Sequence, residues 1–295
     1  MKNKILISCA NGEISYELIS FLKKKYYVIG IDNNKLGLAK KICDKFLVSP
    51  KGKSKKFPKF INKISKNVDA IFLFADEEIL NISKNINKFE NIKKKILISD
   101  YKTISICNDK KKLEVKLSKL VNFPALKKSK EVLIKPKIGR GSKNIIILKD
   151  QNIIRSFKNN NKYLVQEFIE GKEFTTDCFF KKNGVLHQLI TRERIVKKNV
   201  SIVGKTVKDK NIISIVKKIS SNLKFKGSVN FQFIKKNNKY YLLEINPRIS
   251  GSIIFSIRSK FDIIKYNINH LKNLKLNINK INYNKIYFRY YQTYN

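Results

Sequence analysis

The chain has 295 residues, which suits two or three packed units better than one minimal domain. It contains no run of about 18 apolar residues, so it holds no ordinary membrane-spanning helix. The net charge of +42 would suit a nucleic-acid-binding protein, but lysine is spread through every segment and does not interleave with aromatic residues as in a stacking platform. We therefore expect no specific nucleic acid and no membrane as partners. The apolar stretch at residues 5–10 is shorter than the roughly 7–15 residues of a signal-peptide core, and we expect a cytoplasmic location.

The first hundred residues alternate apolar strands with helical stretches. Strands are predicted at residues 4–8, 26–31, 71–74 and 95–98, and residues 13–24 have the apolar spacing of a helix. Strands that alternate with helices indicate a parallel α/β sheet, so we expect one Rossmann-like unit here. Its first turn lacks the G-x-G-x-x-G pattern of a dinucleotide site, and Asp32 alone is a weak indication of a ribose contact.

The remaining chain predicts a change to an α+β architecture. A helix is expected at residues 108–121, with Asn108 or Asp109 as its cap. Strands are expected at 132–135, 145–148 and 163–166, and mainly antiparallel strands at 174–180, 186–191, 229–234 and 240–245, with a helix at 212–222 between them.

The most informative pattern is a pair of strands that carries oxygen ligands beside a guanidinium. A turn signal centred at Asn238 predicts a hairpin that sets Gln232 opposite Glu244. Because strand side chains alternate between faces, Glu244, Asn246 and Arg248 should project to one side. Such oxygen ligands suit Mg²⁺, and the guanidinium suits a phosphate. The alternative, an ordinary hairpin with polar side chains facing solvent, is disfavoured because the second strand is otherwise apolar.

Two further segments could contact a nucleotide. Lys135-Pro136 leads into a glycine-rich loop with Gly139, Gly141 and Ser142, and such a loop can offer backbone N–H groups to phosphates. Residues 166–173 form a strand that opens into a short link, whose backbone could hold adenine while an acidic side chain holds ribose. Each of these segments alone is a common turn.

Together and in this order, the segments resemble the ATP-grasp superfamily, and most closely single-unit relatives of the carbamoyl-phosphate synthase large subunit. The glycine-rich loop resembles that family's K-P-x-x-G-x-G-S motif, residues 165–173 its hinge, and the hairpin its Q-F … E-x-N-P-R signature. The resemblance covers nearly the whole chain. It implies a Rossmann-like domain at 1–100, a small ATP-grasp subdomain with the glycine-rich loop at 101–165, and a C-terminal ATP-grasp subdomain with the Mg-ATP site at 166–295.

The resemblance also implies a role for each matching residue. The cofactors would be ATP and Mg²⁺, with Mn²⁺ as an alternative metal, and the metal ligands would be Gln232, Glu244 and Asn246. The nucleotide would be held by Lys110, Lys135, Gly139, Gly141, Ser142, Glu167, Phe168, Ile169 and Glu173. Arg248 would stabilise the transferring phosphoryl group, and Arg192 and Arg194, two apart on one strand, would face the acceptor. The segment between Pro124 and Lys135 is shorter than in relatives, which leaves the covering of ATP open.

The function implied by the resemblance is an ATP- and Mg²⁺-dependent ligase that activates a small carboxylate as an acyl phosphate for attack by an amine. The partners would be these small molecules, and a homodimer is left open. Two alternatives remain. One is a regulatory ATP-binding protein without catalysis on the same fold, and the less favoured one is a basic nucleic-acid-binding protein.

Overall fold

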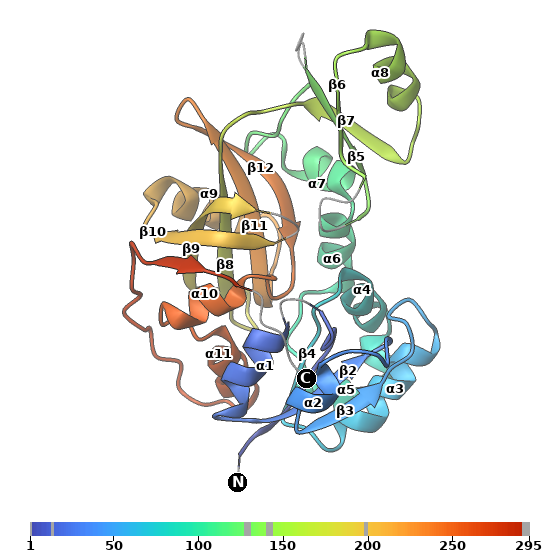
Figure 1. Ribbon diagram of the computed structural model, residues 1–295, viewed down its shortest axis with the longest axis vertical. Helices are drawn as coiled ribbons and strands as arrows, with labels where there is room; N and C mark the ends of the chain where they lie inside the picture. The colour runs from blue at the N-terminus through green and yellow to red at the C-terminus, as the bar shows by residue number, and fades with distance from the viewer. Residues whose placement is uncertain (1, 13–14, 127–130, 140–143, 198–199, 291–295) are drawn as a thin grey trace.

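A parallel sheet forms the N-terminal third of the protein (Figure 1). The computed structural model describes residues 2–12, 15–126, 131–139, 144–197 and 200–290. The sheet has the order β3-β2-β1-β4 and is made of β1 (Lys4–Ile7), β2 (Tyr27–Asp32), β3 (Lys45–Val48) and β4 (Ala70–Phe72). Around it lie α1 (Ser15–Lys23), α2 (Ala39–Ile42), α3 (Lys56–Ser65), α4 (Asp76–Asn85) and α5 (Glu90–Lys95).

Both faces of this sheet are buried, as expected for parallel strands connected by helices. In β1, Ile5 and Ile7 pack with residues of α1, while Leu6 packs on the other side with residues of α3, α4 and α5. The predicted strand at 95–98 is wrong: α5 ends at Lys95, and only Ile98 makes an isolated bridge, to Gly227 of the large sheet. Ile96 and Leu97 are buried there, so the apolar run reflects packing rather than a strand.

A small antiparallel sheet follows, after two helices. The predicted helix at 108–121 is observed as the shorter α7 (Lys110–Leu117), and the side chain of Asp109 caps it, as one of the two predicted caps. A separate helix that was not predicted, α6 (Tyr101–Asn108), precedes it, and the extended backbone of Asp109 separates the two. The sheet has the order β6-β5-β7 and contains β5 (Val132–Pro136), β6 (Ile146–Leu148) and β7 (Tyr163–Glu167), with α8 (Gln151–Lys158) packed on it.

The largest sheet has six strands in the order β12-β11-β8-β9-β10-β13, and its neighbouring strands are antiparallel. The strands are β8 (Lys172–Phe180), β9 (Leu186–Lys197), β10 (Ser201–Val207), β11 (Gly227–Lys236), β12 (Lys239–Asn246) and β13 (Ile286–Phe288). The accompanying helices are α9 (Lys210–Ser220), α10 (Ile253–Arg258) and α11 (Ile263–Leu271). The prediction that a parallel α/β region is followed by a mainly antiparallel α+β region is confirmed.

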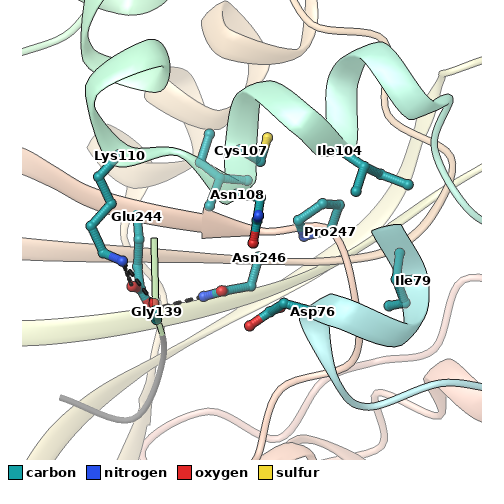
Figure 2. A pocket seen from close by; sticks show the side chains of 11 residues that line it. Asp76, Ile79, Ile104, Cys107, Asn108, Lys110, Gly139, Glu244, Asn246 and Pro247 are labelled. Atoms are coloured by element: carbon teal, nitrogen blue, oxygen red, sulfur yellow. Dashed lines mark hydrogen bonds and ion pairs between the residues drawn. The ribbon is translucent and has the colours of Figure 1, made fainter. Parts of the chain in front are cut away.

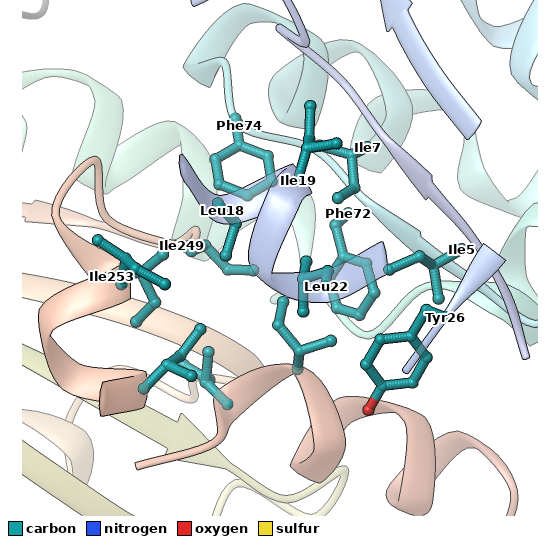
Figure 3. Close-up of a cluster of buried hydrophobic side chains, with 14 of the residues drawn as sticks. Ile5, Ile7, Leu18, Ile19, Leu22, Tyr26, Phe72, Phe74, Ile249 and Ile253 are labelled. Carbon is teal, nitrogen blue, oxygen red and sulfur yellow. The ribbon is translucent and has the colours of Figure 1, made fainter. Parts of the chain in front are cut away.

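One hydrophobic core joins the first sheet to the C-terminal helices (Figure 3). In this core, Leu18 and Leu22 of α1 and Phe72 of β4 lie in the same cluster as Ile253 and Ile264 of α10 and α11. The two ends of the chain therefore stabilise each other, and the boundaries near residues 100 and 165 stay predictions. No helix in the described ranges is long and apolar enough to cross a membrane.

Candidate functional site

The hairpin of β11 and β12 contains one extra residue. Asn237 and Asn238 have φ angles of 46° and 58°, so they form a two-residue turn with Lys236 paired to Lys239. Counting back from this turn would place Gln232 opposite Leu243. The ladder instead shifts by one residue beyond the pair Phe233–Leu242, and Gln232 lies opposite Glu244. The predicted pairing is confirmed, but a β-bulge at Leu243 produces it rather than a turn centred at Asn238.

The bulge decides which side chains of β12 face the site. Tyr240 and Leu242 are buried in the core beneath the sheet, and Ile245 joins the same core although it is an odd number of residues further on. Glu244 and Asn246 therefore project to the opposite face. There the Asn246 side-chain amide donates to Glu244 Oε1 at 2.8 Å, and Arg248 Nη2 donates to Asn246 Oδ1 at 3.3 Å.

Glu244 and Asn246 line a small cavity together with Asp76, Lys110 and Gly139 (Figure 2). Lys110, the first residue of α7, donates from Nζ to the carbonyl of Gly139 at 2.8 Å and lies 4.0 Å from Glu244 Oε2. The cavity has a volume of about 20 Å³, room for little more than one water molecule. A triphosphate is much larger than this volume, so the lining would have to move apart to admit one.

Lys135 adds a second, buried ammonium close to this cavity. Only 8% of the residue is exposed, at the end of β5. Burial lowers its pKa to about 8, although the Glu244 carboxylate acts in the opposite direction, and the nearby Lys110 lowers it further. The Glu244 and Glu114 carboxylates offset the burial of this lysine only in part, so a negatively charged ligand nearby would stabilise its charged form.

Arg248 has a partner that the sequence did not point to. Its Nε donates to Asp76 Oδ1 at 2.6 Å, and its Nη2 donates to Asp76 Oδ2 at 3.3 Å. Burial alone would lower the pKa of Arg248, but Asp76, with a smaller contribution from Glu244, outweighs it and raises that pKa. Asp76 begins α4 in the N-terminal unit, and no local pattern in the sequence links it to a residue 172 positions away.

The two other predicted catalytic arginines lie on the same face of β9, as expected, but in different surroundings. Arg192 is fully buried, and its Nη2 donates to Asp177 Oδ2 at 2.7 Å and to Ser250 Oγ at 3.2 Å. It lines neither cavity described in this section, so the predicted contact with an acceptor has no support in this conformation. Arg194 Nη1 donates to Glu173 Oε2 at 3.1 Å and to Gln232 Oε1 at 3.3 Å. Desolvation lowers the pKa of Arg194 against the attraction of Glu173 and Glu244.

The residues predicted to contact the nucleotide do not all lie at the small cavity. Glu173 is paired with Arg194 and with Lys197, so its carboxylate is held beside the large sheet. In the predicted hinge, Glu167 ends β7, Phe168 N donates to the carbonyl of Glu131 at 3.2 Å, and Ile169 is buried. Gly139 has a φ of 151° and lines the small cavity. Gly141 and Ser142 lie outside the described residues.

The donor set for a divalent metal fits a small, hard cation. Within the described residues no group of three or more His, Cys, Asp or Glu side chains could hold a metal. Glu244 supplies one carboxylate, and Gln232 and Asn246 supply amide oxygens, which at present accept from Arg194 and Arg248. Mg²⁺ is commonly bound by one or two carboxylates plus phosphate and water, so this set is chemically adequate.

A much larger cleft opens next to the small cavity. It has a volume of about 980 Å³ and shares Asp76, Asn108 and Gly139 with the small cavity. Four lysines on its wall have no ion pair among the described residues: Lys53, Lys55, Lys84 and Lys88. Asn81 of α4 donates to the carbonyls of Gly52 and Ser54, which fixes the loop that carries the first two of them.

Comparisons with known proteins agree on one fold. Residues 159–292 match the family described as "ATP-grasp in the biosynthetic pathway with Ter operon". Over 205 residues the chain is 24% identical to the carbamoyl phosphate synthase large chain of Clostridium botulinum (strain Kyoto / Type A2), a match that covers 64% of this chain and 18% of that protein. The chain thus spans less than a fifth of the length of that relative.

Solved structures extend the match to almost the whole chain. The biotin carboxylase domain of the Hydrogenobacter thermophilus 2-oxoglutarate carboxylase, solved with MgADP, ADP and bicarbonate, has a TM-score of 0.74 at 16% identity and covers 97% of this chain and 74% of that one. An L-amino acid ligase from Bacillus licheniformis has a TM-score of 0.69 at 15% identity and covers 92% and 74%. At these identities the likeness shows the fold.

Proposed function

Because the chain is an ATP-grasp protein that resembles the large chain of carbamoyl phosphate synthase, we propose that it is an ATP-dependent ligase. It would activate a small carboxylate as an acyl phosphate, which an amine then attacks. The observation that carries this proposal is the meeting of Glu244, Asn246 and Arg248 from one hairpin end with Lys110 and Lys135. Oxygen ligands and three cationic groups within one small region suit a metal-bound triphosphate.

Each side chain has a separate task in this proposal. Lys110 and Lys135 attract the phosphates, and Glu244 anchors the metal with amide oxygens from Gln232 and Asn246. Bound Mg²⁺ would neutralise the charge of the phosphates and orient them. Arg248 stabilises charge on the transferring phosphoryl group. Glu173 and the hinge at 167–169 are proposed to hold ribose and adenine.

The reaction would proceed in two displacements. A substrate carboxylate oxygen attacks the γ-phosphorus of ATP in line, and the bond to ADP breaks. The amine, as the free base, then attacks the acyl carbon, and inorganic phosphate leaves while the nitrogen loses a proton. The protein mainly positions the reactants and stabilises charge. We place the carboxylate and amine in the 980 Å³ cleft, because it shares Asp76, Asn108 and Gly139 with the small cavity. The expected cytoplasmic location and the homodimer stay predictions.

Two measurements test the proposal. In thermal melts at physiological ionic strength, Mg-ATP at 100 times its Kd should stabilise the protein by about 2.7 kcal/mol, whereas ATP with a chelator should give no comparable shift. Duplex DNA should bind through a diffuse field that weakens steeply with salt. A screen of amino acids and small acids should then identify one that releases ADP.

The outcomes separate the three functions. Stabilisation by Mg-ATP with ADP release that depends on an acid and an amine supports the ligase. Stabilisation without ADP release across a broad panel would favour a regulatory ATP-binding protein. No shift with Mg-ATP beside a salt-resistant shift with DNA or RNA would reverse our ranking and favour nucleic-acid binding.

A further inference from the structure

The contact between Asp76 and Arg248 joins the N-terminal sheet to the hairpin that carries the site. Asp76 is the first residue of α4, and Arg248 follows β12 by two residues. Their side chains are 19% and 13% exposed, and the carboxylate grips one edge of the guanidinium with both oxygens. Asp76 also lines both the small cavity and the large cleft, so it lies where the phosphoryl site meets the proposed substrate space.

The hydrogen bonds of Arg248 leave little capacity for a ligand. A guanidinium has five N–H donors. Two of them bond to Asp76, one to Asn246 Oδ1 at 3.3 Å and one to the carbonyl of Ile249 at 3.2 Å. One N–H, on Nη1, has no partner among the described residues. In this conformation a phosphoryl group can therefore accept one hydrogen bond from Arg248. A bidentate interaction with two phosphoryl oxygens would require Asp76 or Asn246 to be displaced.

We propose that Asp76 is a positioning residue for Arg248. Asp76 holds the guanidinium in place and weakens the binding of phosphate by Arg248 before the reaction. This inference rests on the proposed function. A carboxylate beside the guanidinium offsets its charge, so nucleotide in the ground state is held less tightly. The single remaining N–H is fixed in place, and its bond strengthens as charge develops on the transferring group. Interactions that are stronger in the transition state than in the ground state accelerate the reaction.

A purely structural role for the pair makes a different prediction. If Asp76 only pinned the N-terminal unit to the hairpin, its loss would lower stability and weaken nucleotide binding. Asp69 offers a matched control, because its carboxylate pairs with Lys272 at 2.9 Å and likewise joins the first sheet region to a C-terminal helix end, away from the site. Asp69→Asn should lower stability but leave nucleotide affinity and turnover near the wild-type values.

The experiment compares Asp76→Asn, Asp76→Glu and Asp69→Asn with the wild type. The affinity for a non-hydrolysable ATP analogue with Mg²⁺ is measured by calorimetry, and kcat and the KM for Mg-ATP by ADP release. Asp76→Asn should bind the Mg-analogue about 3- to 10-fold more tightly, with a lower KM, while kcat falls about 10-fold or more. Asp76→Glu keeps the charge, so its affinity for the Mg-analogue should return to near the wild-type value while its longer side chain still lowers kcat several-fold.

Weaker or unchanged binding of the Mg-bound ATP analogue by folded Asp76→Asn would overturn the inference alone. Should that variant not fold, an unchanged kcat in Asp76→Glu would overturn it. Wild-type protein that does not bind the Mg-bound ATP analogue would overturn the proposed function together with this inference.

Discussion

Among the residues that the structure describes, two arginine–aspartate pairs are in close contact: Arg248–Asp76 beside the cavity and Arg192–Asp177 inside the fold. The donor chemistry is the same, and the surroundings differ. Asp177 also accepts hydrogen bonds from Asn230 and Ser256. The side chains of Asp177 and Arg192 are 2% and 1% exposed, respectively. Arg192 Nε and Nη1 have no hydrogen-bond partner among the described residues. In the Arg248 pair, Asp76 lines both the small cavity and the large cleft.

The difference teaches that burial, rather than residue type, decides what each pair controls. A pair that borders a cavity can exchange a partner for a ligand, so its loss should appear mainly in turnover. A pair sealed between β8, β9 and α10 has no ligand to exchange with in this conformation, so its loss should appear mainly in folding. Breaking such a pair leaves one uncompensated buried charge, which is strongly destabilising. Substitutions at the cavity and in the buried pair therefore test whether turnover and folding are affected separately.

The largest effect is expected from Glu244→Gln on the cavity side. The substitution removes the only carboxylate of the proposed metal site and should lower ADP release on the order of 10³-fold, while the free energy of unfolding changes by less than about 1 kcal/mol. Glu193→Gln is the matched control. Glu193 lies on the face of β9 opposite to Arg192 and Arg194, and it pairs with Lys172 at 3.4 Å. Normal ADP release by folded Glu244→Gln protein would remove Glu244 from the site.

Arg192→Leu should show the opposite behaviour on the buried side. Asp177 would be left buried without its charge partner, and the protein should lose about 3–5 kcal/mol of stability. Urea unfolding measures this loss. The double variant Arg192→Leu/Asp177→Leu should recover part of it, because it removes both charges. A folded Arg192→Leu protein with wild-type stability and no turnover would instead place Arg192 at the acceptor, as the family resemblance implies.

Arg248→Lys should lower kcat about 10²-fold, because lysine keeps the charge but loses the planar fork and the hydrogen bonds that fix it. Its melting temperature should stay close to that of the wild type. Arg258→Lys is the control: Arg258 pairs with Glu17 at 3.2 Å and is largely exposed. A kcat within a few-fold of the wild type would mean that Arg248 faces away from the transferring group.

The smallest effect concerns pH and Lys135, which is buried yet close to the cavity. Its pKa of about 8 in the free protein means that it loses its proton as pH rises through this value. The KM for Mg-ATP should therefore rise several-fold between about pH 7 and pH 9, and Lys135→Arg, which keeps its charge, should flatten this rise. An unfolded lysine keeps its proton until about pH 10.4, so this group should also make stability rise with pH between these two values.

A flat pH dependence of KM in the wild type would show that Lys135 stays charged or does not contact ATP. Urea unfolding at several pH values, compared between wild type and Lys135→Gln, isolates the contribution of this lysine from other groups.

Local patterns in the sequence predicted the parts of the fold that depend on short-range physics. Strands β1, β2 and β4 and the Asp109 cap follow from apolar spacing and capping residues. Strand β3 was not predicted, and the Gln232–Glu244 pairing depends on the bulge at Leu243. The family motif also brought Glu244, Asn246 and Arg248 together, and their mutual hydrogen bonds bear out that they share one side.

What the sequence could not predict depends on contacts between distant segments. Asp76 meets Arg248 only because the first sheet packs on the C-terminal helices through a shared core. Arg192 is buried because α10 and the segment before it cover that part of β9, through Ser250 and the ring of Phe255. Periodicity along one strand shows which face a side chain takes, but not what another part of the chain lays upon it.

The extra residue at Leu243 has a consequence for folding specificity. A hairpin without it is a competing state in which Glu244 would lie opposite Phe231 in the core and Ile245 would face the site. Forming the bulge disrupts the ladder locally, at a cost of about 1 kcal/mol per lost hydrogen bond, whereas burying an unpaired carboxylate costs several kcal/mol. The Glu244 carboxylate, which we assign to metal binding, thus also favours the hairpin with the bulge over the hairpin without it. An apolar residue at 244 would weaken that selection, which makes Glu244→Gln the cleaner test of chemistry.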